Sequence, residues 1–180
     1  MGTSPAVPDR RAVHEEMEQA RQTFHCLLDN ATVADLRRPS SGTKWTNEQL
    51  LFHMLFGYLI VRALLVLARN FSRLPDPASL AFARLLDAGR TPFDMVNYRG
   101  SRLGARVIPA SRTGPKFDRV IAALERSLER EPDSALRRGM HYPISWDPFF
   151  TGYMTLYDIY RYPTRHFDFH RRQLTLHDPG

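Results

Sequence analysis

The sequence predicts an all-α protein organised around four long helices. Apolar residues recur at helical spacing over 9–30, 116–131 and 155–174, and the stretch 46–70 is apolar almost throughout. Two of these segments begin with residues that cap helices: Thr46 is followed three residues later by Gln49, and Thr155 by Asp158. A four-helix bundle is the simplest way to bury such faces against one another.

Each predicted helix has a recognisable boundary. The first follows Asp9, a suitable N-cap, and the second runs to about Asn70, shortly before the prolines at positions 75 and 77. Pro115 is expected to open the third helix. Pro163 lies inside the fourth, where we expect a kink because proline removes one backbone hydrogen bond.

Long connections are predicted between the second and third helices and between the third and fourth. Residues 71–115 contain a short helix over 78–88, ended by Gly89, and then a stretch without clear periodicity. Residues 132–154 begin with Pro132, carry Pro143 and Pro148 further on, and show no long helical pattern. Connections of this length often form a lid or a pocket wall.

Composition fits one folded domain. The chain has 180 residues, 43% apolar and 24% charged, enough to bury a core without disulfides. We expect a flexible tail over 1–8 and a single helical domain over 9–176. The single cysteine, Cys26, excludes an internal disulfide and a cysteine-rich zinc site, and it is better explained as a helix filler than as a catalytic thiol.

The positive charge does not by itself indicate a nucleic-acid-binding protein. The formal net charge is +6, but 23 of the 25 basic residues are arginine and they are spread along the whole chain. Such a preference for arginine is typical of a GC-rich bacterial genome. Because no segment interleaves basic and aromatic residues, we expect a small-molecule substrate rather than a nucleic acid.

The apolar stretch 50–68 is long enough to cross a bilayer. It contains His53 and Arg62, and an arginine near mid-membrane costs about 2.5–3.5 kcal/mol. The stretch is explained without this free-energy cost if it forms the central helix of a bundle, which can be apolar on nearly every face. Since the first residues also lack the apolar core of a signal peptide, we expect a cytoplasmic protein without a membrane span, and the apolar excess suggests a homodimer.

Three histidines form the clearest chemical pattern. His166 and His170 are four residues apart, so they share one helical face with Cβ atoms about 5–6 Å apart. Ile159 marks this face as inward, and buried imidazoles need partners. His53 lies inside the apolar second helix, where Gly57, one turn later, is expected to leave room for a ligand.

Taken singly, these histidines have simpler explanations: His53 as a core residue bonded to a carbonyl, His166 and His170 as a polar surface pair. Their joint occurrence favours a metal site. Three neutral imidazoles leave a metal ion with one open position, which is typical of catalytic sites. Asp168 points away from His166, so no hydrogen-bonding partner for the ligands is evident, and His141 is only a weak candidate for a substrate contact.

Two segments resemble a known family. The run WTNEQLLFHMLFGY in the second helix and RYPTRHFDFHRRQL in the last resemble the DinB/YfiT-like metalloenzyme family. That resemblance implies a DinB-like four-helix bundle in which His53, His166 and His170 bind a divalent metal ion. Gln173 matches the glutamine that follows the histidine pair in the family.

The resemblance also implies a function. Family members of known activity are similar to thiol S-transferases, which join a low-molecular-weight bacterial thiol to an electrophile. Three imidazoles suit zinc or nickel equally. We consider Arg62, Arg99, Arg102 and Arg165 as partners for a carboxylate of the thiol. Two alternatives remain open: a metal-dependent hydrolase, and a non-enzymatic module that binds metal or a small molecule.

Overall fold

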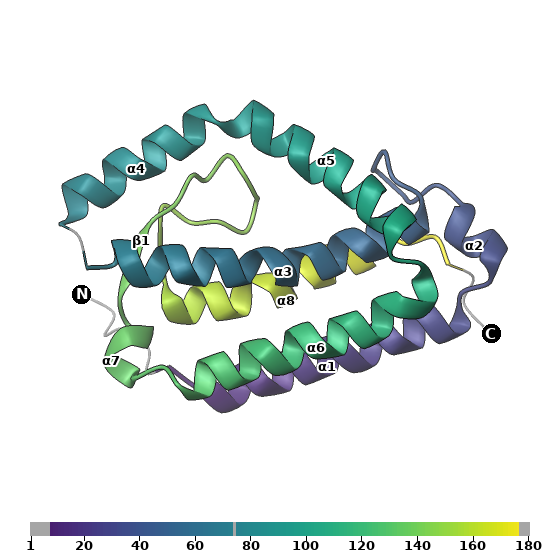
Figure 1. The fold of residues 1–180 in the computed structure, drawn as a ribbon, viewed down its shortest axis with the longest axis horizontal. Coiled ribbons are helices and arrows are strands. Elements are labelled where there is room, and N and C mark those ends of the chain that lie inside the picture. The colour runs from purple at the N-terminus through teal and green to yellow at the C-terminus, as the bar shows by residue number, and fades with distance from the viewer. Residues whose placement is uncertain (1–7, 74, 177–180) are drawn as a thin grey trace.

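We analysed a computed structural model, which describes residues 8–73 and 75–176. Four long helices dominate it: α1 (Arg10–Asn30), α3 (Asn47–Phe71), α6 (Ala110–Glu129) and α8 (Leu156–Arg171). Their contacts close a ring, because α3 packs on α8 and α6 while α1 packs on α6 and α8 (Figure 1). The all-α fold expected from the sequence is confirmed. Residues 1–7 of the predicted tail lie outside the described residues.

The helix starts confirm the capping pattern of the sequence. Asp9 accepts a hydrogen bond from the first turn of α1. Reciprocal capping boxes open α3, between Thr46 and Gln49, and α8, between Thr155 and Asp158. The helix α8 continues through Pro163 and ends at Arg171, three residues before the predicted boundary.

Aromatic and aliphatic side chains from all four long helices form one core. Phe24 of α1 packs on Phe117 of α6 with ring centroids 4.4 Å apart, and Tyr58 of α3 meets the same ring at 4.9 Å. The helix α3 is the one described helix that is long and apolar enough to cross a membrane, but 61% of its apolar window is buried inside the protein. A core helix passes the same test, so α3 is explained by its place in the bundle.

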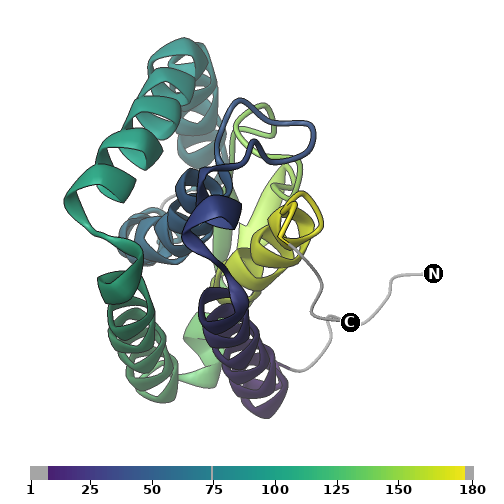
Figure 2. The same cartoon turned by 90° about the vertical axis from the view of Figure 1, so that its right-hand side faces the viewer.

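The connection between α3 and α6 differs from the sequence prediction. A helix α4 (Asp76–Ala88) matches the predicted short helix, but the following stretch is helical too, as α5 (Arg90–Val107). Figures 1 and 2 place α4 and α5 outside the bundle, over α3. The expectation of a non-periodic connection was wrong because α5 packs through small residues, Ser101 and Ala105, which are buried without forming an apolar stripe.

The start of α6 is also earlier than predicted. It begins at Ala110 rather than at Pro115, which lies inside the helix. The proline removes one backbone donor, yet the turn before it is held by packing, because Thr113 and Gly114 are buried. Because Gly114 has no β-carbon, the ring of His25 on α1 can pack closely against it.

Short elements complete the chain. The helix α2 (Val33–Arg37) precedes α3, and α7 (Asp133–Leu136) follows α6. Strands β1 (Gly139–His141) and β2 (Tyr153–Thr155) pair antiparallel, with Met140 opposite Met154. The loop between these strands, residues 142–152, is followed by β2, which leads directly into α8.

The contact between α5 and α3 yields a prediction for two glycines of the same helix. A β-carbon at Gly104 would lie 2.0 Å from the buried ring of Phe52, whereas one at Gly100 would meet nothing within 4 Å. We expect Gly104→Ala to lower the free energy of unfolding by about 1–3 kcal/mol through overpacking. Gly100→Ala should raise it by about 0.5–1 kcal/mol, because alanine favours a helix. Urea unfolding measures both, and equal effects would contradict this packing.

Candidate metal centre

Three imidazole rings meet where α3 faces α8. His53 lies in the second turn of α3, and His166 and His170 lie one turn apart near the end of α8. The ring centroids are separated by 4.9 Å for His53 and His166, 4.6 Å for His53 and His170, and 4.4 Å for His166 and His170. One nitrogen from each ring belongs to a set whose members all lie within 4.8 Å of one another. The structure thus brings together the three residues that the sequence selected.

A glycine allows the rings to come this close. A β-carbon at Gly57 would lie 2.8 Å from Nδ1 of His166, closer than side chains approach one another. From the sequence, this glycine was expected to leave room for a ligand beside His53. Instead, the ring of His166 occupies that space, so Gly57 acts as the cradle for a histidine.

Hydrogen bonds determine the tautomer of two of the rings. Nδ1 of His53 lies 3.1 Å from Oγ of Ser101, whose hydroxyl donates to the carbonyl oxygen of Asn97, so Oγ accepts a hydrogen bond from the Nδ1–H of the ring. Nδ1 of His170 lies 2.7 Å from Oε1 of Gln173 and donates to it. In both rings, Nε2 therefore carries a lone pair rather than a proton.

The two lone pairs face each other. Nε2 of His53 lies 3.2 Å from Nε2 of His170, and neither carries a hydrogen that could bridge the gap. Two nitrogens bound to one tetrahedral zinc ion at 2.0–2.1 Å would be about 3.3 Å apart. The spacing and the tautomers therefore fit a shared cation, which removes the repulsion between the lone pairs.

Burial keeps the cluster neutral. His53 and His166 are 3% and 4% exposed. Burial, with the neighbouring His170, lowers the pKa of His53 to about 3, and burial lowers the pKa of His166 well below its ordinary value. Burial also lowers the pKa of His170, against an opposing hydrogen bond to Gln173. Neutral imidazoles at neutral pH are the form that binds metal ions.

A carboxylate that the sequence analysis did not identify lies beside the cluster. Oδ2 of Asp147, in the loop 142–152, is 3.8 Å from Nε2 of His166. The same oxygen accepts a hydrogen bond from the hydroxyl of Tyr162, and Oδ1 accepts one from the backbone N–H of Phe149. Burial raises the pKa of Asp147, although both hydrogen bonds oppose the change.

A pocket of about 640 Å³ opens next to the histidines. His170 and Gln173 form one side, and Trp45 and Tyr98 line it with two rings whose planes differ by 25°. The ring of Trp45 also stacks on His53 at 4.4 Å. Neither aromatic wall was predicted from the sequence, because Trp45 directly precedes a helix cap and Tyr98 lies in the stretch where no clear periodicity was expected.

The arginines considered as substrate partners do not line this pocket. Its cation is Lys44, at the edge beside Trp45. The guanidinium of Arg102 lies over the ring of Tyr98, 5.5 Å from its centroid.

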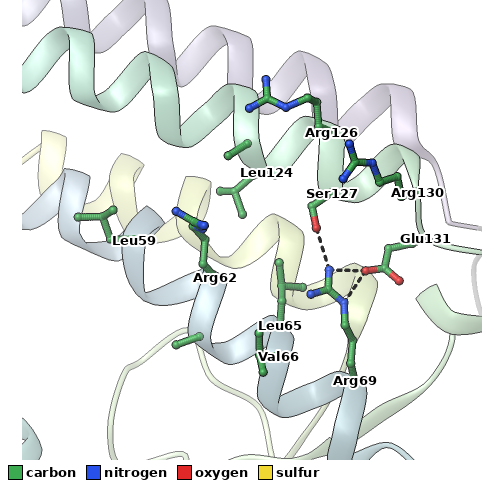
Figure 3. A pocket seen from close by; sticks show the side chains of 12 residues that line it. Leu59, Arg62, Leu65, Val66, Arg69, Leu124, Arg126, Ser127, Arg130 and Glu131 are labelled. Atoms are coloured by element: carbon green, nitrogen blue, oxygen red, sulfur yellow. Dashed lines mark hydrogen bonds and ion pairs between the residues drawn. The ribbon is translucent and has the colours of Figure 1, made fainter.

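A second, larger pocket of about 890 Å³ lies between α3 and α6 (Figure 3). Arg62 lines it together with Arg126 and Arg130, above an apolar floor. Its partly buried ion pair is already satisfied, since Arg69 binds Glu131 at 2.5 Å and also bonds Ser127. Among the described residues that line this groove there is no histidine or cysteine, and its one carboxylate, that of Glu131, is paired with Arg69.

The remaining candidate side chains lie outside the cluster. Nδ1 of His141 binds the carbonyl oxygen of Gly152 inside the β-hairpin. Cys26 is exposed on α1 rather than packed as a filler.

The lowered pKa of His53 gives a testable pH dependence. In the unfolded chain a histidine titrates near 6.5, so between this value and about 3 the unfolded state binds more protons than the folded state. The metal-free protein should therefore lose stability as the pH falls below about 6.5, and His53→Gln should reduce that slope by up to about 1.4 kcal/mol per pH unit. Urea unfolding at pH 7.5 and 5.5 measures this, and identical slopes would show that His53 is not desolvated.

Comparison with known proteins identifies the family. The family model described as the DinB superfamily matches residues 16–174, which include all three histidines and Gln173. No curated protein and no solved structure matched the chain. Because the match covers most of the chain, this protein belongs to the DinB superfamily.

Proposed function

We propose that this protein binds one divalent metal ion through His53, His166 and His170. One observation supports this proposal most directly. The Nε2 atoms of His53 and His170 face each other with their lone pairs at 3.2 Å in a buried site. The unpartnered, buried Nδ1 of His166 adds a third nitrogen without a hydrogen bond. These donors suit zinc or nickel.

We further propose that the protein is a metal-dependent transferase that joins a low-molecular-weight bacterial thiol to an electrophile. When bound, the metal would supply a positive charge that stabilises the thiolate at neutral pH. Three neutral imidazoles contribute no compensating charge, so the site favours an anionic sulfur ligand. The pocket beside His170 gives both substrates access to this position.

The chain's own residues would orient the two substrates. Trp45 and Tyr98 offer apolar faces for a planar electrophile, and Lys44 offers a cation for a carboxylate of the thiol. Gln173 keeps the ring of His170 oriented through the hydrogen bond at Nδ1. Water would be excluded on the side where Trp45 covers His53.

Two alternatives use the same residues. In a metal-dependent hydrolase, water rather than a thiol would be the nucleophile. In a non-enzymatic binding module, the pocket would hold a small molecule without reaction. We also propose a cytoplasmic location, which suits a reduced thiol substrate, and a homodimer.

Metal content tests the binding site. Protein purified without a histidine tag should contain about one equivalent of zinc or nickel, and His170→Ala should contain almost none, because the variant loses one of three ligands. His141→Ala is the matched control, since its ring binds a hairpin carbonyl and packs on Tyr153, outside the cluster, and it should keep the wild-type content. Atomic emission on dialysed protein measures all three. A wild-type protein without metal after reconstitution would contradict the proposal.

Thiol transfer is tested separately on the loaded protein. Cysteine-derived thiols with a haloaromatic electrophile should react faster with protein than in its absence, and His170→Ala should reduce the rate to the protein-free value. Chromatography of the thioether product measures the reaction. If loaded protein gives no acceleration while activated esters are hydrolysed, the hydrolase alternative replaces the transferase.

A further inference from the structure

We infer that Asp147 is a positioning residue for the metal site: its carboxylate holds Nε2–H of His166, so that His166 offers Nδ1 to the metal ion, whereas His53 and His170 offer Nε2. This inference rests on the proposed metal site and assigns a role to a residue of the loop 142–152 that no sequence pattern indicated.

The first observation concerns the two nitrogens of His166. Nδ1 is buried without any hydrogen-bond partner, whereas Nε2 lies 3.8 Å from Oδ2 of Asp147. Burial keeps the ring neutral, so it carries a single N–H. If the hydrogen is on Nε2, Oδ2 of Asp147 is its acceptor once these two atoms approach each other by about 0.8 Å. Placing it on Nδ1 would bury a donor against Gly57 with no acceptor.

The second observation is that two hydrogen bonds orient the carboxylate of Asp147. The hydroxyl of Tyr162 donates to Oδ2 at 2.9 Å, and the backbone N–H of Phe149 donates to Oδ1 at 2.8 Å. Tyr162 is one turn before His166 on α8, so the helix that carries the histidine also orients its partner. A carboxylate oxygen can accept a second hydrogen bond, which leaves Oδ2 free to accept from the imidazole.

The loop itself is fixed on both sides. Nε1 of Trp146 donates to the carbonyl oxygen of Leu86 on α4, and Ser145 bonds Asp87. On the other side, Phe149 packs on Phe169 at 5.5 Å and Phe150 on Tyr162 at 4.8 Å. Asp147 is therefore held beside α8 by contacts that do not involve the histidines.

The third observation concerns the negative charge of the Asp147 carboxylate. The side chain of Asp147 is 12% exposed, and among the described residues no lysine or arginine forms an ion pair with it. A buried carboxylate without a cation is unfavourable. A divalent ion held by three neutral rings has two uncompensated charges, so ion and carboxylate stabilise each other through the imidazole between them.

The tautomer of His166 is the most direct test, because it can be read without metal. Long-range ¹H–¹⁵N spectra of protein labelled at the histidine rings distinguish Nδ1–H from Nε2–H, and the loss of signals in His166→Gln assigns the ring. We expect Nε2–H for His166, and Nδ1–H for His53 and His170. In Asp147→Asn, whose amide can donate to Nε2, His166 should shift toward Nδ1–H. Finding Nδ1–H for His166 in the wild-type protein would overturn the inference.

Zinc affinity provides a second readout. Competition with a chromophoric chelator should show a loss of about 10–100-fold in Asp147→Asn, as for other residues that hydrogen-bond a metal ligand. Asp168→Asn is the matched control, since it removes the same charge two residues from His166 but no bond to the cluster, and it should stay within about threefold of wild type. Equal losses of zinc affinity in both variants would show that removing a nearby negative charge explains the effect, and they would overturn the positioning role of Asp147. If wild-type protein binds no zinc, the proposed function fails, while the tautomer still decides the role of Asp147.

Discussion

The close approach of α3 to α8 is the constraint on which the site depends. These two helices form the most extensive pairing of elements in the protein. Their contact places one histidine of α3 against two of α8, and it is possible only because residue 57 has no side chain to occupy the position of the His166 ring. The same glycine that permits the packing thus sets the distance between the imidazoles.

This packing buries the polar nitrogens of three imidazoles, and the surrounding residues provide hydrogen-bond partners for only some of them. Ser101 and Gln173 each accept a hydrogen bond from the Nδ1–H of one ring and direct the opposite nitrogen inward. The inward nitrogens then meet as lone pairs in a buried space, where protonation is disfavoured by desolvation. Neutral, preoriented donors whose lone pairs converge in a buried space are unfavourable by themselves, and this geometry makes the cluster compatible with metal binding.

The insertion between α3 and α6 links the fold to the site. By folding over α3 rather than extending into solvent, α5 delivers Ser101 to His53 and Tyr98 to the adjacent pocket. The loop before α8 has a comparable role on the other side, where it brings Asp147 to His166. Both connections of the bundle therefore contribute residues next to the three histidines.

Local patterns were sufficient to predict the bundle and the three histidines from the sequence. The capping boxes at Thr46 and Thr155 involve residues three apart, and the histidine pair of α8 is one turn apart, so chain geometry alone places them. The helix α5 was missed because it packs through Ser101, Gly104 and Ala105, small residues that give no apolar periodicity. Asp147 was missed because its position depends on contacts with α4 and α8 that are distant in the sequence.

The central claim is that three imidazoles bind a single metal ion, and anomalous diffraction from zinc-soaked crystals tests it most directly. The account predicts one strong peak between α3 and α8, about 2.0–2.1 Å from one nitrogen each of His53, His166 and His170. Rings that keep these positions at saturating zinc with no peak between them would contradict it.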